Sequence, residues 1–200
     1  MLIFGRNHGP KFNFMDFLNK YSHSKNKRFS SFKKALEIAK SRDLKTFVET
    51  GTSRGKIKFF FFFKYNWKDG MSTLIFSEYV KNYNGHLFTC DINPINIKNS
   101  KKFVNVSEKF VTFVVDDSIN FLKNFKNHID FLYLDSLDGQ DPSSSEHQLN
   151  EIEASYLKLH KNSLVLLDDK GAKTKLSLSF MLKNNFKILN ETNEQVLLGF

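Results

Sequence analysis

The chain has 200 residues, of which 40% are hydrophobic, and this size suits one globular domain with a sizeable core. Its single cysteine, Cys90, excludes an internal disulfide framework and favours a reducing compartment. The first residues lack the apolar stretch of a secretory signal, and no apolar run is long enough to span a bilayer. We therefore expect a cytoplasmic protein that does not enter a membrane.

The net charge of +9 is concentrated near the N-terminus. Residues 1–45 hold eleven lysine or arginine residues and three acidic residues. Such a segment could contact nucleic acid or another polyanion, but no recognised nucleic-acid-binding motif accompanies it. We interpret residues 1–29 as a solvated, partly mobile basic arm with one short helix near residues 14–21. Residues 30–200 would then form a single domain.

The first elements of this domain lead to a glycine turn. Residues 30–42 are predicted to form a helix, because their apolar residues recur at i, i+3, i+4 and i+7. The β-forming residues 46–48 predict a buried strand that ends at Glu49. Gly51 follows in the turn, where glycine lets a ligand approach the backbone closely.

Five consecutive phenylalanines then occupy positions 59–63. The run shows neither helical nor strand alternation. We interpret residues 55–69 as an insertion within a loop, which adds little closure entropy. The alternatives are an apolar lid over a pocket and a hydrophobic patch for a partner. A turn over residues 67–70 leads into a helix from Ser72 to about Tyr83.

Further apolar runs alternate with predicted helices along the rest of the chain. We predict strands over residues 86–91, 111–115, 129–134 and 163–167, and a final pair over residues 186–189 and 195–200. A tight polar turn joins the last two, which predicts antiparallel pairing. The alternation predicts an α/β fold with a Rossmann-like, doubly wound sheet of seven strands, mostly parallel, with an antiparallel C-terminal strand.

Acidic residues follow the predicted parallel strands. Ligands of such sheets bind outside the carboxyl ends of the strands. The acids expected at that edge are Glu49, Asp91, Asp117, Asp135 and Asp168. Their shared position predicts a polar binding site there.

Several of these stretches carry a resemblance to a known family. They are FVETGTSRG, DGMSTLIFSEYV, HLFTCDINP, VTFVVDDSINFL, IDFLYLDS and SLVLLDDK. Over about residues 30–200 the chain resembles class I S-adenosylmethionine-dependent methyltransferases, most nearly the small-molecule and sugar O-methyltransferase branch with its macrocin and catechol types. The chain departs from that pattern at the Phe-rich insertion of about residues 55–69, which separates the ETGT turn from the ST-containing helix.

The resemblance implies a site for S-adenosylmethionine. The residues that would contact this cofactor are Glu49, Gly51, Thr52, Ser72, Thr73, Asp91, Asp117 and Ser118. Ser72 and Thr73 would lie near the methionine end. Asp91 would accept hydrogen bonds from the ribose hydroxyls, because a carboxylate offers only acceptors, and Asp117 and Ser118 would contact the adenine. Each acid could instead be a helix N-cap or a first-turn charge.

Three acids at the ends of neighbouring strands predict a metal site. Asp135, Asp168 and Asp169 would place three like charges together, which is unfavourable unless a cation or protons offset them. Carboxylate oxygens suit Mg²⁺, and the resemblance implies a divalent metal at the same positions. The other interpretation is a set of helix caps and solvated loop acids.

The implied reaction moves a methyl group from a sulfonium to a hydroxyl oxygen of a small molecule or sugar. The enzyme mainly aligns donor and acceptor, and a metal would lower the pKa of the acceptor hydroxyl. The candidate catalytic residues are Asp135, His147 and Asp169, with Lys170 as an alternative base. Two other functions stay open, a cofactor-binding partner module without catalysis and a nucleic-acid methyltransferase that uses residues 1–45. The second is disfavoured because no N/D-P-P-Y/F signature is present. A homo-oligomer is compatible with the sequence.

Overall fold

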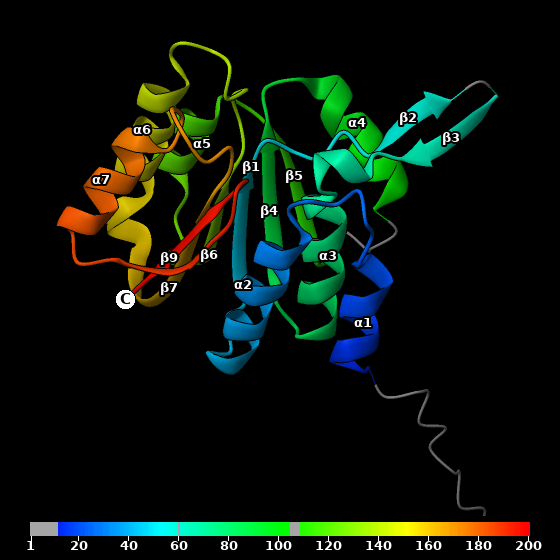
Figure 1. Cartoon of the computed structure of the whole chain (residues 1–200), viewed down its shortest axis with the longest axis horizontal. Coiled ribbons are helices and arrows are strands. Elements are labelled where there is room, and N and C mark those ends of the chain that lie inside the picture. The colour runs from blue at the N-terminus through cyan, green and yellow to red at the C-terminus, as the bar shows by residue number, and fades with distance from the viewer. Residues whose placement is uncertain (1–11, 60, 105–108) are drawn as a thin grey trace, which may run out of the picture.

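The computed structural model describes residues 12–59, 61–104 and 109–200, and a seven-stranded sheet forms its middle layer (Figure 1). The strand order is β5-β4-β1-β6-β7-β9-β8. The bounds are β1 Thr46–Thr50, β4 His86–Asp91, β5 Val111–Val115, β6 Ile129–Leu134, β7 Leu159–Leu167, β8 Lys187–Glu191 and β9 Val196–Gly199. Strand β1 pairs in parallel with β4 and β6, and β9 runs antiparallel between β7 and β8. The predicted α/β fold with an antiparallel C-terminal strand is confirmed.

Helices cover both faces of this sheet (Figure 1). Their bounds are α1 Phe14–Tyr21, α2 Phe29–Ser41, α3 Ser72–Asn82, α4 Pro94–Phe103, α5 Ser118–Asn124, α6 Ser144–Ser155 and α7 Lys175–Lys183, with short 3₁₀ turns η1 Trp67–Asp69 and η2 Tyr156–Lys158. Successive side chains of a strand point to opposite faces. Phe47 of β1 therefore packs in a core with residues of α1, α2 and α3, whereas Val48 packs in a second core with residues of α5, α6 and α7. This covering leaves the carboxyl ends of the parallel strands as the edge where a site can form.

The N-terminal segment packs into the domain from α1 onward. Helix α1 buries Phe17, Leu18 and Tyr21 in the first core, and Lys20 forms an ion pair of 2.6 Å with Glu78 of α3. The short helix is confirmed, but the prediction of a solvated, mobile arm is wrong for residues 12–29. Apolar side chains spaced i, i+3, i+4 and i+7 along α1 outweigh the surrounding lysines. The rest of the predicted arm, residues 1–11, lies outside the described residues.

The Phe-rich insertion forms a separate two-stranded antiparallel sheet. Strands β2 Lys56–Phe59 and β3 Phe62–Tyr65 make a hairpin that projects from the domain beside α4 (Figure 1). Phe61, between the two strands, is 92% exposed. The insertion, predicted to lie within a loop, is therefore a hairpin of two paired strands that extends outward. Across the described ranges, every helix is too short or too polar to cross a bilayer.

Candidate functional site

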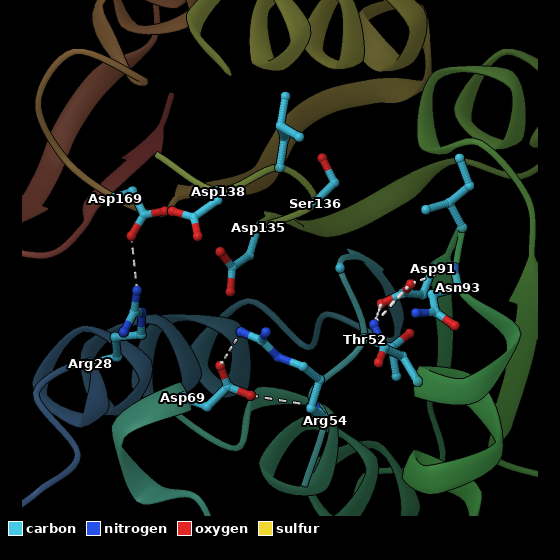
Figure 2. A pocket seen from close by; sticks show the side chains of 14 residues that line it. Arg28, Thr52, Arg54, Asp69, Asp91, Asn93, Asp135, Ser136, Asp138 and Asp169 are labelled. Carbon is cyan, nitrogen blue, oxygen red and sulfur yellow. Dashed lines mark hydrogen bonds and ion pairs between the residues drawn. The ribbon is translucent and has the colours of Figure 1, made fainter. Parts of the chain in front are cut away.

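Two adjoining cavities lie at the edge where β1, β4 and β6 end, and Figure 2 shows the residues that line the larger one. The larger has a volume of about 390 Å³ and the smaller of about 120 Å³. Both are lined by Gly51, Asp91, Ile92, Ser136 and Leu137. The larger is also lined by Arg28, Thr52, Arg54, Asp69, Asn93, Asn96, Asp135, Asp138 and Asp169, and the smaller by Cys90, Asp117, Ser118 and His147. We call the two together the cleft.

The glycine turn after β1 lines both cavities through Gly51. Gly51 has a φ of +82°, and a Cβ at this position would lie 2.0 Å from the carbonyl oxygen of Asp135. Its backbone N–H donates to the carbonyl of Cys90 at 2.9 Å, and the N–H of Asp135 donates to the carbonyl of Thr50 at 2.9 Å. Only glycine combines this conformation with so close an approach. The turn is therefore fixed between the ends of β4 and β6.

Glu49 is fully buried behind this turn. Its carboxylate accepts hydrogen bonds from the hydroxyls of Ser72 at 2.5 Å, Thr89 at 2.6 Å and Thr73 at 2.7 Å. Burial raises the pKa of Glu49 to about 7, although these three hydrogen bonds oppose the shift. The hydroxyl of Thr73 also accepts from the backbone N–H of Ser53 at 2.9 Å. Direct cofactor contacts were predicted for Glu49, Ser72 and Thr73, but none of the three lines the cleft, and they instead anchor the loop that does.

Asp91, at the end of β4, lines both cavities. Its Oδ1 accepts from the backbone N–H of Asn93 at 2.8 Å, and the side-chain amide of Asn96 lies 3.0 Å from Oδ2. Within the described ranges these donors are neutral and no basic side chain forms an ion pair with Asp91. A carboxylate has about four acceptor sites, so acceptor capacity is left for a ligand. The structure thus brings Gly51, Thr52 and Asp91 together in the larger cavity, as predicted, and Figure 2 shows Thr52 and Asp91 there.

Asp117, Ser118 and His147 meet in the smaller cavity. Asp117 is the N-cap of α5 and accepts from the backbone N–H of Asn120 at 2.9 Å, so it is both a cap and a lining residue. His147 Nε2 lies 3.1 Å from the hydroxyl of Ser118, and its pKa is raised by a side-chain interaction with the buried Glu151. The predicted catalytic histidine therefore lies with the predicted adenine-binding residues, and not with the acids that end β6 and β7.

Those acids do come together, as predicted. One oxygen from each of Asp135, Asp168 and Asp169 lies within 4.8 Å of the others, and we call these three residues the acid cluster. Asp168 is fully buried, and both its oxygens are bound: Arg28 Nε lies 2.7 Å from Oδ1 and Arg28 Nη2 2.7 Å from Oδ2. Gln195 Nε2 donates to Oδ1 at 2.7 Å, and Arg28 Nη2 also reaches Asp169 at 2.9 Å.

A second basic side chain enters the acid cluster from the loop before α7. Lys173 Nζ lies 3.2 Å from Asp169 Oδ2 and 3.6 Å from Asp135 Oδ1, and its side chain is 1% exposed. Burial alone would raise the pKa of Asp168, but the hydrogen bonds and charge of Arg28 lower it. The pKa of Asp135 is raised well above its ordinary value, because Asp135 is desolvated by the surrounding protein and repelled by the charge of Asp168.

Several residues of the cleft were not predicted from the sequence. Arg54 and Asp69 form an ion pair of 3.1 Å across the larger cavity from Asp135 (Figure 2). Arg28 lies in the segment interpreted as a mobile arm, so no local pattern pointed to it. Lys173 follows Asp169 by four residues, but both lie in the bend and turn before α7, so the pairing rule for helices did not point to their ion pair. Lys170, the alternative base, instead pairs with Glu191 at 2.8 Å.

Comparisons with known proteins agree with this fold. Residues 67–170 match the family model described as a methyltransferase domain. No curated protein matches the chain. Among solved structures, the SAH-bound methyltransferase PaMTH1 of Podospora anserina is 13% identical with a TM-score of 0.61, covering 93% of this chain and 86% of that one.

Two further solved structures have different described activities. The O-methyltransferase NovP is 11% identical with a TM-score of 0.64, covering 86% of this chain and 79% of that one. An rRNA methylase from Streptococcus thermophilus is 11% identical with a TM-score of 0.58, covering 84% of this chain and 95% of that one. At such identities the likeness establishes the fold alone.

Proposed function

The chain belongs to the methyltransferase domain family, and on that premise we propose that it transfers a methyl group from S-adenosylmethionine to a hydroxyl oxygen of a small molecule or sugar. The observation that carries the proposal is the cleft of two adjoining cavities with Asp91 on the wall they share. S-adenosylmethionine needs a small apolar cavity for its adenine, a hydrogen-bond acceptor for its ribose hydroxyls and a polar cavity for its methionine end, in that order. The cleft offers all three.

The nucleoside would lie across Asp91 into the smaller cavity. The carboxylate of Asp91 accepts a hydrogen bond from each of the two ribose hydroxyls. Hydrogen bonds from Asn93 and Asn96 orient this carboxylate. Ile92 and Leu137 line the smaller cavity and supply apolar surface for the adenine. Ser118 and Asp117 supply polar groups at its edge. This assigns His147 to the adenine side of the cleft.

The methionine end would lie in the larger cavity beside the glycine turn. Its carboxylate and ammonium groups carry opposite charges, and the ion pair of Arg54 with Asp69 offers the complementary charges at 3.1 Å from one another. Gly51 allows the backbone to approach the ligand without a Cβ. Glu49, Ser72 and Thr73 contribute indirectly, because their hydrogen bonds hold the loop.

The acid cluster does not fit the predicted Mg²⁺. Both oxygens of Asp168 are already bound by Arg28 and Gln195, and Lys173 lies within 3.6 Å of both other acids. A divalent cation would have to displace these charged donors. No step of the proposed reaction therefore passes through a metal.

Methyl transfer would then depend on alignment and on one proton acceptor. The acceptor hydroxyl attacks the methyl carbon in line with the sulfonium, the carbon–sulfur bond breaks, and its electron pair stays on the sulfur of the product thioether. The hydroxyl proton passes to a carboxylate and then to solvent. Asp135 is the best placed of the predicted bases, because Asp169 already accepts from Arg28 and Lys173. Asp135 lines the larger cavity.

Cofactor binding and acceptor choice can be tested together. S-adenosylhomocysteine at 100 times its Kd should add about 2.7 kcal/mol to the free energy of unfolding, and Asp91→Ala should remove most of that gain. Asp16→Ala, an exposed acid of α1, is the matched control. Transfer of a labelled methyl group should occur to hydroxylated small molecules and not to ribosomal RNA. Transfer to RNA alone would reject the proposed acceptor class, and an unchanged gain in Asp91→Ala would reject the ribose contact.

A further inference from the structure

The acid cluster contains two basic side chains that come from distant parts of the sequence. Arg28 precedes α2 and Lys173 precedes α7, yet both lie among Asp135, Asp168 and Asp169. Three carboxylates with two monovalent cations have a formal charge of −1. Three carboxylates with one divalent cation have the same formal charge. The two side chains thus provide the compensation that a metal ion would otherwise give.

Arg28 matches the geometry of two carboxylates at once. Its Nε and Nη2 bind the two oxygens of Asp168, and Nη2 also reaches Asp169 at 2.9 Å. This is the planar, forked pairing that a guanidinium makes with carboxylates. The Arg28 side chain is 15% exposed and that of Asp168 is fully buried, so an unpaired charge on either would be costly.

The chain also holds Arg28 in place from the other side. Arg28 Nη1 donates to the carbonyl of Lys68 in η1 at 3.2 Å, and the side chain of Asn26 donates to the carbonyl of Gly70 at 3.0 Å. These contacts hold the segment before α2 against η1 and Gly70, and the guanidinium would lose its hydrogen bond to Lys68 if it left the acid cluster. The same η1 carries Asp69 of the cleft.

We infer that Arg28 and Lys173 permanently occupy the position of a divalent cation, so that this chain binds none there and transfers its methyl group without one. Arg28 is a positioning residue in this account, since it acts through Asp168 and Asp169 and leaves Asp135 to accept the proton. The occupancy of the acid cluster stands on the geometry alone. The metal-free reaction rests on the proposed function.

Metal binding to the full chain tests the inference without relying on turnover. Mn²⁺ is titrated into chelator-treated wild-type protein, Arg28→Ala and the control Lys27→Ala, and free Mn²⁺ is measured by electron paramagnetic resonance. Lys27 is the adjacent basic residue, with a side chain that is 79% exposed. Wild type and Lys27→Ala should bind no Mn²⁺ at the acid cluster. Arg28→Ala should gain one Mn²⁺ site that wild type lacks, because three carboxylates then face one cation, Lys173.

Each result decides one part of the inference. If wild type bound one Mn²⁺ per chain and Asp168→Asn abolished that binding, the inference that Arg28 and Lys173 occupy the cation position would be overturned, even if Arg28→Ala failed to fold. Arg28→Lys keeps the charge without the fork and should bind no Mn²⁺, so a gain of binding there would also contradict it. Methyl transfer that needs Mg²⁺ in a wild type that binds no metal at the cluster would refute the metal-free reaction alone. Absence of any methyl transfer would count against the proposed function and leave the metal-binding result intact.

Discussion

Two acidic groups at the same edge of the sheet have opposite environments. Asp91 ends β4, is partly exposed, and accepts hydrogen bonds from the neutral Asn93 and Asn96. Asp168 follows β7, is fully buried, and is bound by Arg28 and Gln195. Equivalent positions in a parallel sheet therefore do not imply equivalent roles. The partner of each carboxylate decides whether it can receive a ligand or serves to hold the fold together.

The partners also differ in their distance along the chain. Asn96 follows Asp91 by five residues, whereas Arg28 and Asp168 are separated by 140. The first arrangement is local and joins the end of β4 to the first turn of α4. The second joins the N-terminal segment to the end of β7, so it fixes tertiary structure. We expect substitutions in the two places to affect different measured quantities.

The largest effect should follow the loss of Arg28. Arg28→Ala leaves the buried Asp168 without its ion pair and should lower the free energy of unfolding by about 3–5 kcal/mol. Urea denaturation in excess chelator measures this loss, and Lys27→Ala should change stability by about 0.5 kcal/mol or less. If Arg28→Ala lowered the free energy of unfolding by less than about 1 kcal/mol, Asp168 would not be a structural acid distinct from Asp91.

Gly51 lies between the two acidic groups and should have the next largest effect. Gly51→Ala combines an unfavourable positive φ with a Cβ placed 2.0 Å from the carbonyl oxygen of Asp135. The expected loss of stability is about 2–4 kcal/mol, measured by thermal unfolding. Gly171 has a φ of +140° and nothing within 4 Å of an added Cβ, so Gly171→Ala isolates the backbone strain. Equal losses in the two variants would show that the close approach at Gly51 is unimportant.

Asp91 should matter for binding and little for stability. Asp91→Ala removes two hydrogen bonds to a charged acceptor and should weaken S-adenosylhomocysteine binding by about 1.5–3 kcal/mol, or roughly 10- to 150-fold. Isothermal titration calorimetry gives the Kd, and urea denaturation of the same variant checks its stability. If stability fell as far as in Arg28→Ala, Asp91 would be a structural acid like Asp168.

Glu49 lies in a third environment, in which hydroxyl groups surround a buried acid. Its pKa is raised from the ordinary value of 4.5 to about 7 in the folded chain. The folded state then binds more protons than the unfolded state, so the free energy of unfolding falls as pH rises from about 4.5 to 7. The slope from this group is at most about 1.4 kcal/mol per pH unit. Glu49→Gln should reduce the change of the free energy of unfolding with pH over this range, measured by urea denaturation. An unchanged slope would mean that other groups cause the pH dependence.

The fold was predictable because its signals are local. Apolar runs of strand length alternate with helical periodicity from residue 46 onward, and each predicted parallel strand ends near an acid. The gathering of Asp135, Asp168 and Asp169 followed from parallel pairing alone. Asp91 and Asp117 followed from their positions after strands, and both line the cleft.

The unpredicted features depend on contacts between distant residues. Arg28 lies in a lysine-rich segment, and its pairing with Asp168 depends on where α2 packs against the sheet. Glu49 is buried among Ser72, Thr73 and Thr89, and the sequence does not show that these three hydroxyls come together in space. The β2–β3 hairpin was missed because consecutive phenylalanines lack the alternation of a strand with one buried face.

Calorimetric titration of S-adenosylhomocysteine into wild-type protein in excess chelator shows whether the cleft binds the nucleoside without a metal ion. We expect one binding site per chain, with an affinity that does not change when Mg²⁺ replaces the chelator, because Asp91 receives the nucleoside and Arg28 with Lys173 completes the acid cluster. Absence of binding, or binding that appears only with Mg²⁺, would contradict it.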